Sequence, residues 1–516
     1  MIDLLKEVPE KQRSLIQSFF FSFIFFFCSH LYRFTHLGYT DDSVEILQRT
    51  NRNWQLSLGR WLQVFYWKVR GQIVVPYVIG LLAFLFFALS IYLIVRMLNL
   101  HSNLSVALLC IVLGCNGTLT FSNATYISWT DVYMLAFLMS CLSVTFTRKW
   151  SLGFVPGSIC LCMTLALYQA YLQTAILLFM ILFVKDCLTE HSTLFTFLKK
   201  VLHAILTLIC GLLLYAVSLI VVEKHTGIER SMGYNGVGRV GHYTLSEIPR
   251  LLFETWKAPF RTLLKPETNL PGLTTICAIG MIVLSIFLVC LLIRKNHVYG
   301  YRIFVIALLL LTMPFGMNVV FFLSHGMEHS LMIFSFFLFF AFPIMLMEIC
   351  DAKTIWARRS RIIAGPLVAV MLLNNFVYAN QVYARRDLEF WSTLSLMTRV
   401  IDRAEQVEGY QSGYTNVAII GTLYNSPLAM QRPGFEQLEG NSPYMNNNYY
   451  ATSGETFYPA YFWEILGYPF NLVPENERYR IAHTAEVVNM PTFPEPGCCQ
   501  MIDDVLVIKI GRVAGE

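Results

Sequence analysis

Residues 19–27 read FFFSFIFFF, and the apolar run around them extends from residue 14 to residue 34. A helix needs about 20 apolar residues to cross the hydrocarbon core of a bilayer, so this run is long enough for one crossing. A small-residue cleavage site does not follow the run, which favours a retained helix over a signal peptide. We therefore expect residues 14–34 to form a transmembrane helix.

Ten further apolar runs follow, at residues 73–95, 102–119, 131–147, 152–167, 170–186, 201–222, 272–293, 303–322, 331–349 and 362–380. The fifth and sixth runs of the chain form one block, divided only by Tyr168, Gln169 and Tyr171. We expect this block to be either two spans or one tilted helix with a re-entrant piece. The sequence thus predicts an α-helical polytopic membrane protein with about 11 transmembrane helices.

The composition agrees with this fold class. Of the 516 residues, 56% are hydrophobic and only 14% are charged. A soluble domain has about 25% charged residues, so the shortage of charge excludes a soluble enzyme. Every cluster of Lys and Arg has hydrophobic flanks, which argues against nucleic acid as a partner and makes the lipid bilayer the expected surroundings.

Lys and Arg in short connections indicate the orientation, because connections rich in them stay in the cytoplasm. The connections 120–130 and 323–330 carry none. The N-terminus and the alternate connections do carry them, at Lys6, Lys11, Arg13, Arg96, Arg148, Lys149, 185–200, Arg294, Lys295 and 353–361. We expect a cytoplasmic N-terminus and, with an odd number of spans, a periplasmic tail on a bacterial inner membrane.

The tail, residues 381–516, differs from the transmembrane domain, residues 1–380. It holds 9 basic and 16 acidic residues, against 29 and 17 in the preceding part, and 9 of the 19 prolines. An expected helix at 388–407 precedes strand-like runs at 417–420 and 505–510. We therefore predict a periplasmic C-terminal α/β domain that has its own core.

Two long loops on the expected periplasmic side, 35–72 and 223–271, hold twelve basic residues. Long loops escape the orientation rule, so one interpretation is that these charges have no special role. The other is that both loops face a polyanionic ligand at the membrane surface.

The first of these loops begins with GYTDDS at residues 38–43, so Asp41 and Asp42 follow the first span closely. A neighbouring carboxylate and partial desolvation both raise a carboxyl pKa toward the range that suits a general base. Adjacent side chains point in different directions, so the two residues are expected to have different roles. Alternatively, Thr40 or Asp41 caps a helix that begins near Val44, and the residues alone leave both readings open.

The same loop alternates aromatic and basic residues, with Trp54, then Arg60 and Trp61 in the stretch GRWL, then FYWK at 65–68. Such a pattern is typical of a helix that lies in the membrane interface. Arg60 is also a candidate ligand for a phosphate, because a guanidinium pairs with phosphate through two hydrogen bonds.

Other polar candidates stand at the ends of predicted spans. Asp131 lies at the start of the fourth span, and Tyr168 and Gln169 lie between the fifth and the sixth. Near mid-membrane the predicted spans contain no Asp, Glu, Lys or Arg. Ion-coupled transporters need ionisable groups there, so this absence argues against such a transporter.

The segment SHGMEHS at residues 324–330 contains His325, Glu328 and His329. On a helix, the spacings i+3 and i+4 would place all three on one face. This spacing favours a solvated or hydrogen-bonded cluster over a metal site.

Together these motifs resemble those of the serotype-converting O-antigen glucosyltransferases of bacteria and their phages. The shared features are Asp41-Asp42, Trp54, the Gly-Arg-Trp of residues 59–61, Tyr168-Gln169, and the tail segment NMPTFPEPG at residues 489–497 before a hydrophobic strand. The resemblance covers nearly the whole chain.

The resemblance implies a GT-C glycosyltransferase with its active site at the periplasmic membrane face. The donor would be undecaprenyl-phosphate-glucose, the acceptor a sugar of the lipid-linked O-antigen repeat, and the base Asp41 or Asp42. The reaction would invert the anomeric carbon, and the residues leave open whether a divalent cation assists. Candidates for binding the donor phosphate are Arg60, Lys68, Lys257, Arg261 and Lys265. Candidates for binding sugars are Trp54, Trp61, Asp131, Tyr168, Gln169, His325 and Glu328.

Three alternatives remain at this point. A flippase for lipid-linked oligosaccharides and a non-catalytic assembly protein belong to other functional classes, and an O-antigen polymerase is the nearest enzymatic alternative.

Overall fold

A computed structural model describes residues 9–39, 43, 52–190, 193–233, 243–350, 354–421 and 460–511. The chain divides into two compact units. The first comprises Met1–Phe34, Gln48–Asn123 and Ile127–Asn380, and the second comprises Thr35–Leu47, Ala124–Tyr126 and Gln381–Glu516. Asp41 and Asp42 lie outside the described residues, so their roles stay predictions.

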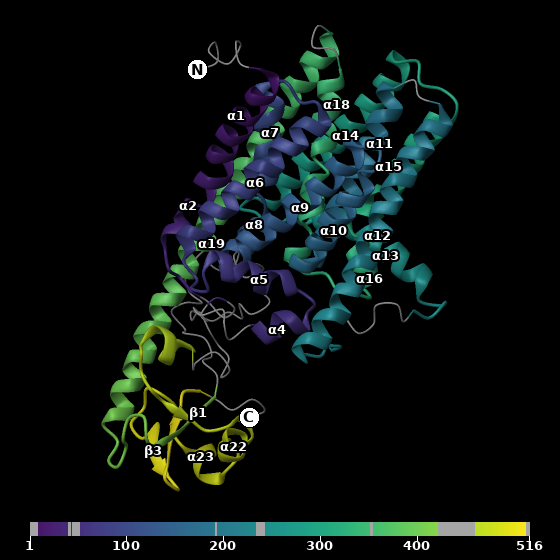
Figure 1. Cartoon of the computed structure of the whole chain (residues 1–516). Coiled ribbons are helices and arrows are strands. Elements are labelled where there is room, and N and C mark those ends of the chain that lie inside the picture. Colours follow the sequence, from purple (N-terminus) through teal and green to yellow (C-terminus); the bar gives the residue numbers. More distant parts are fainter. Residues whose placement is uncertain are drawn as a thin grey trace. The chain divides into compact units, whose positions relative to one another are not determined.

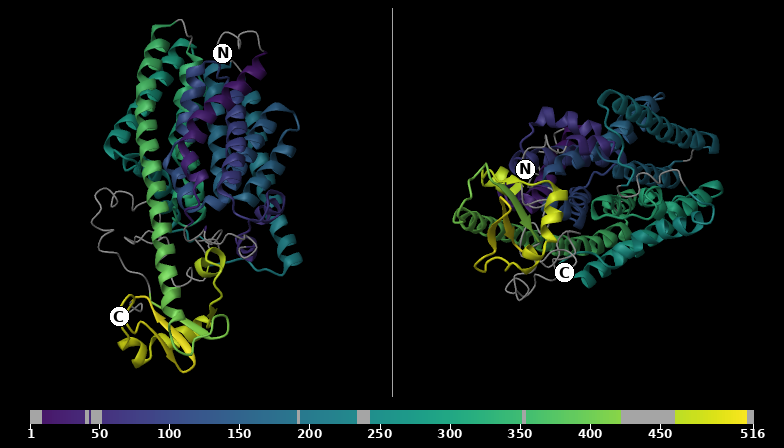
Figure 2. Two further views of the ribbon diagram at one scale, coloured as in Figure 1. Left: turned by 90° about the vertical axis from the view of Figure 1, so that its left-hand side faces the viewer. Right: turned by 90° about the horizontal axis from the view of Figure 1, so that it is seen from below.

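The first unit consists of helices, and each of the eleven predicted runs contains one (Figure 1). The helices of the first five runs are α1 (Glu10–Ser22) with α2 (Cys28–Thr35), α6 (Pro76–Leu98), α7 (Asn103–Gly114) with α8 (Gly117–Thr125), α9 (Thr130–Lys149) and α10 (Phe154–Leu167). The others are α11 (Leu172–Thr189), α12 (Leu194–Thr226), α14 (Pro271–Lys295), α15 (Tyr301–Met317) with α16 (Val319–Leu323), α17 (Phe334–Leu338) with α18 (Ala341–Ile349), and α19 (Ile355–Glu405). Figure 2 shows the same helices from two further directions. Helix α9 packs against α6 and against α10, and α10 also packs against α12.

The lengths and apolar composition of these helices confirm a membrane protein. In the described part of the chain, seven helices are long and apolar enough to cross a bilayer, or eight if the bent pair α7 and α8 forms one span. Three shorter apolar segments are Phe154–Leu167, Tyr301–Met317 and Phe334–Ile349. The total of about 11 spans stays a prediction.

The apolar block that was predicted in two ways forms two helices. α10 ends at Leu167, Tyr168 is extended with φ −160° and ψ 114°, and Gln169–Tyr171 form a single 3₁₀ turn before α11. The break thus falls at the polar residues that interrupt the apolar run.

The third predicted run is also broken, because α7 and α8 meet at a bend of 46°. Asn116 stabilises both sides of this bend. Its Nδ2 donates to the carbonyl of Leu113 (2.9 Å), and its Oδ1 accepts from the backbone N–H of Leu119 (3.1 Å), which caps α8. The predicted connection 120–130 therefore begins inside a helix.

Both basic loops contain helices. The first contains α4 (Arg52–Ser57) and α5 (Trp61–Arg70), as the aromatic and basic pattern predicted. The second contains α13 (Ile248–Leu264), which the sequence analysis did not predict. The indole Nε1 of Trp256 in α13 donates to the carbonyl of Leu311 in α15 (2.8 Å) and so fixes α13 against the helices of the first unit.

The described part of the tail forms a small α/β fold, as predicted. Its strands are β1 (Asn416–Ile420), β2 (Asn471–Leu472), β3 (Cys499–Ile502) and β4 (Val505–Lys509), in the order β2-β1-β4-β3. β1 runs parallel to β2 and β4, and β3 runs antiparallel to β4. Helices α22 (Glu475–Ala482) and α23 (Ala485–Asn489) contribute Ile481 and Val487 to a core with Ile420 and Val507.

The helix predicted at residues 388–407 is present as far as Glu405, but it does not stand alone. This segment is the continuation of α19, which also includes the last predicted run and crosses the boundary between the two units. No Gly or Pro occurs between Pro366 and Gly409, so the sequence contains no signal that would end the helix earlier.

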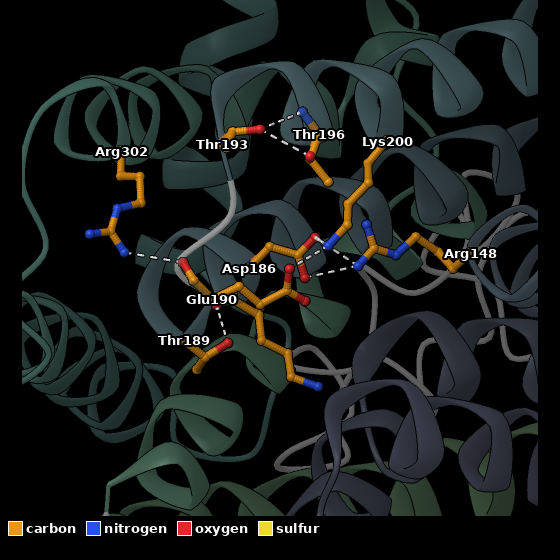
Figure 3. A network of polar contacts seen from close by, with 9 residues as sticks. Arg148, Asp186, Thr189, Glu190, Thr193, Thr196, Lys200 and Arg302 are labelled. Carbon is orange, nitrogen blue, oxygen red and sulfur yellow. Dashed lines mark hydrogen bonds and ion pairs between the residues drawn. The ribbon is translucent and has the colours of Figure 1, made fainter.

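Acidic and basic residues at the ends of α9, α11 and α12 form a compact ionic network (Figure 3). Arg148 and Lys200 both reach the carboxylate of Asp186, at 2.7 and 3.1 Å, and Lys200 also pairs with Glu190 at 2.6 Å. The guanidinium of Arg302 donates to the backbone carbonyl of Glu190 (3.1 Å). These contacts join four helices of the first unit.

Candidate functional site

A cavity of about 250 Å³ lies in the first unit, between the end of α13, the start of α14 and the segment before α17. Its polar wall contains Arg261, Lys265, Glu267, Glu328 and His329, and its apolar wall contains Phe336, Phe337 and Phe340. We call it the polar pocket. It brings together three of the predicted residues, namely Arg261, Lys265 and Glu328.

Hydrogen bonds hold the segment 265–268 against α14. The hydroxyl of Thr275 donates to the carbonyl of Leu264 (3.1 Å), and the hydroxyls of Thr268 and Thr274 are 3.1 Å apart. Asn374 of α19 donates to the hydroxyl of Thr274 (3.2 Å). This bracing orders the segment that carries Lys265 and Glu267.

The charges of the polar pocket are only partly compensated. Arg261 lies 3.6 Å from Glu328, which also accepts a hydrogen bond from Asn318 (3.5 Å). Lys265 has no carboxylate partner among the described residues, and neither does Arg60 nearby. These two cations could therefore interact with an anionic group that enters the pocket.

Two titratable groups of the pocket have shifted pKa values. The Glu267 carboxyl is open to the pocket but closely surrounded by protein, and this desolvation raises its pKa to about 7. Burial, and then the charge of Arg60, lower the pKa of His329 to about 4. His329 is consequently uncharged at neutral pH, whereas the charge of Glu267 changes near pH 7.

The effect of Arg60 on His329 links the polar pocket to a second cluster. Arg60 lies over the ring of Tyr168 (4.8 Å), and its Nε donates to Gln169 (3.5 Å). Gln169 in turn donates to the carbonyl of Leu58 (2.8 Å) and to the hydroxyl of Tyr215 (2.9 Å). Three predicted residues from distant parts of the sequence thus lie together.

Gly59 allows this close approach. Its φ is +76°, and a Cβ at this position would lie 2.6 Å from the Tyr215 hydroxyl. The next aromatic residue, Trp61, donates to the hydroxyl of Ser218 (3.0 Å), one turn further along α12. The GRWL stretch is therefore anchored on α12.

Asp131 has a different environment. It is fully buried and pairs with the side chain of Arg70 at 2.8 Å, and the hydroxyl of Tyr66 donates to it at 2.8 Å. Burial and the Asp131 charge raise the pKa of Tyr66. This pairing joins α5 to α9, and binding of a sugar by Asp131 stays a prediction.

The other predicted residues do not line the polar pocket. Lys257 lies 3.9 Å from Glu254 on the surface of α13, Lys68 is exposed, and Trp54 is 43% exposed. His325 stacks on Tyr243, with ring centroids 4.5 Å apart.

The expectation that one helix face presents His325, Glu328 and His329 was wrong. α16 ends at Leu323, and the backbone turns at His325 (φ +54°) and Gly326 (φ +92°). Gly favours such a positive φ and ends the helix. Glu328 and His329 line the pocket, whereas His325 does not. Among the described residues, no group of three or more His, Cys, Asp or Glu is arranged to hold a metal ion.

Glu267 was not predicted as a site residue. The available signal was an acidic residue two positions after Lys265 in a far-side loop, just before the apolar run at 272–293. This signal is weak without the knowledge that α13 and α14 enclose a pocket at this point.

The fold and the site define a class of protein, a polytopic membrane protein with a basic, aromatic-walled pocket. The family model Glucosyl transferase GtrII matches residues 31–347, more than half of the chain, and the protein belongs to this family. The predicted resemblance is thereby confirmed, and family membership makes the protein a membrane glycosyltransferase that transfers glucose. No curated protein and no solved structure matches the chain.

Proposed function

We propose that the protein transfers glucose from undecaprenyl-phosphate-glucose to a sugar of the lipid-linked O-antigen repeat, at the periplasmic face of the bacterial inner membrane. The observation that carries the proposal is the polar pocket, in which Arg261 and Lys265 stand beside aromatic side chains. A phosphate matches the cations, and a sugar ring matches the aromatic faces.

The cations would act on the leaving group. When the bond between C1 of glucose and the phosphate oxygen breaks, the bonding electrons go to that oxygen and negative charge develops on undecaprenyl phosphate. Arg60, Arg261 and Lys265 would stabilise this charge more in the transition state than in the bound donor, which lowers the barrier. Lys68 and Lys257 remain predicted contacts for the outer part of the donor.

The acceptor would supply the nucleophile. Its hydroxyl oxygen forms the new bond to C1 from the face opposite the phosphate, so the configuration at C1 inverts. Asp41 would take the hydroxyl proton, and Asp42 would support it. The predicted contacts to the sugars are Trp54, Trp61, Asp131, Tyr168, Gln169, His325 and Glu328.

A reconstituted transfer assay tests the proposal. Purified protein, supplied with donor labelled in its glucose and with lipid-linked acceptor, should move the label to the acceptor and release undecaprenyl phosphate. A flippase releases no undecaprenyl phosphate, and a polymerase joins repeat units without using this donor, so either result would refute the proposal.

A separate experiment tests the side of the membrane. A reporter that is active only outside the cytoplasm, fused after Glu516, should be active. A silent but well-expressed fusion would place the tail in the cytoplasm and make the number of spans even.

A further inference from the structure

A second cavity, of about 260 Å³, lies next to the polar pocket and differs from it in chemistry. Its wall is almost wholly apolar and includes Phe260, Ile282, Ile286, Val289 and Phe342. Leu263, in the last turn of α13, lines both cavities. The two cavities are therefore neighbours that share a wall.

One face of α14 connects the two cavities. Thr274 and Ala278 line the polar pocket, and Ile282, Ile286 and Val289 line the apolar cavity. At 100° per residue these positions fall on one stripe of the helix, and the distance from Thr274 to Val289 is about 22 Å along its axis. The polar end lies at the start of α14, and the apolar end lies toward the middle of this candidate span.

This arrangement suits a ligand with an anionic head and a long apolar chain. An anion seated beside Lys265 would direct an attached chain away from the polar wall and along α14. The apolar cavity begins one helical turn beyond Ala278, so a chain covalently attached to that anion would reach it past Leu263, which lines both cavities.

We propose that the apolar cavity holds the first isoprene units of the donor lipid whose phosphate occupies the polar pocket. This inference rests on the proposed function, because it places the chain of the same donor. It assigns Phe260, Ile282 and Ile286 to recognition of the chain, a role separate from that of the residues that contact phosphate or sugar.

Two tryptophan substitutions on α14 form a matched pair. Ile286 lines the cavity and is 60% exposed, whereas Val283 does not line it and is 59% exposed. Ile286→Trp should obstruct the chain and lower kcat/KM for undecaprenyl-phosphate-glucose about tenfold, and Val283→Trp should change it less than about twofold. Ile282→Trp, also in the cavity wall, should repeat the effect of Ile286→Trp and covers the case in which Ile286→Trp fails to accumulate.

A shortened donor shows whether the effect comes from the chain. With glucose attached through phosphate to a methyl group, which carries no isoprene unit, Ile286→Trp and wild-type protein should have equal kcat/KM. Equal kcat/KM values of the cavity variants and Val283→Trp with the full-length donor would overturn the inference and leave the cavity to ordinary membrane lipid. Wild-type protein that transfers glucose from neither donor would refute the proposed function instead.

Discussion

Two clusters of basic residues in the first unit differ in how their charge is compensated. Around Asp186, Arg148 and Lys200 both have carboxylate partners within 3.1 Å. In the polar pocket, Lys265 has none among the described residues, and Arg261 shares Glu328 with Asn318 at the longer distances of 3.6 and 3.5 Å. The sequence shows basic residues in both places, and only their partners distinguish them.

This difference assigns different tasks to the two clusters. A compensated network gains little from a further ion and serves to join helices. A partly compensated pair of cations beside a cavity favours an anion that comes from outside the chain. The comparison holds if changes in the polar pocket affect glucose transfer and changes around Asp186 affect stability.

The largest effect on glucose transfer is expected at Asp41, because Asp41 is the predicted base that takes the proton of the acceptor hydroxyl. Asp41→Asn keeps the size of the side chain and much of its capping ability but removes its basicity. Loss of a general base costs about 10² to 10⁴ in rate, whereas loss of a helix cap costs only about 1 kcal/mol of stability. The variant should accumulate normally and transfer almost no glucose in the reconstituted assay.

The paired variant Asp42→Asn is the control for this assignment. Activity in Asp41→Asn together with inactivity in Asp42→Asn would exchange the two roles. If both variants stay active, the base is another carboxyl group. Glu267 would then be the first candidate, because it faces the pocket, whereas Asp131 is fully buried against Arg70.

The helices could be predicted from the sequence because lipid imposes one requirement on every span. Each needs a long apolar run, and all eleven predicted runs contain a helix. Local signals also placed the break at Tyr168–Tyr171 and strands β1 and β4. The full length of α19 was not predicted, because the composition changes from apolar to polar within this helix and suggested a boundary where the structure has none.

The polar pocket was harder to predict, because its residues converge from separate parts of the sequence. Arg261 and Glu328 were singled out as basic and acidic residues of far-side loops, but nothing in the sequence shows that they lie 3.6 Å apart. Glu267 was missed because its environment, not its spacing, makes it unusual. Asp131 was singled out because it lies at the start of a predicted span, but the sequence does not show that it pairs with Arg70, which is 61 positions away.

A smaller effect is expected for the cations of the pocket. Arg60→Ala, Arg261→Ala and Lys265→Ala should each lower kcat/KM for the donor roughly ten- to a hundredfold, because each removes a charge-assisted contact of about 1.5 to 3 kcal/mol. Arg250→Ala, at an exposed position of α13 outside the pocket, is the control. Unchanged donor kinetics in all three variants would show that the uncompensated charges do not bind the phosphate.

The next effect concerns pH and Glu267. The raised pKa of about 7 means that this carboxyl is mostly protonated at pH 6 and mostly ionised at pH 8. An ionised carboxylate repels the donor phosphate, so KM for the donor should rise a few-fold between these pH values. Glu267→Gln cannot ionise and should give a flat profile with a KM close to the wild-type value at pH 6. A profile that is equally steep in both proteins would assign the titration to another group.

The smallest effect on transfer is expected around Asp186, where stability should change instead. Asp186→Asn leaves Arg148 without its carboxylate partner and Lys200 with Glu190 alone, and the Asp186 side chain is only 4% exposed. The cost should be about 1 to 3 kcal/mol, below that of a fully buried pair because the two cations are 20% and 27% exposed. Thermal unfolding of the purified protein should show a lower Tm, while kcat/KM of the folded fraction stays within about twofold of wild type.

Glu190→Gln is the matched control, since this carboxylate is 44% exposed and its loss should cost less than about 1 kcal/mol. If Asp186→Asn kept its Tm but lost transfer, the Asp186 cluster would belong to the reaction, and carboxylate compensation would no longer separate the two clusters.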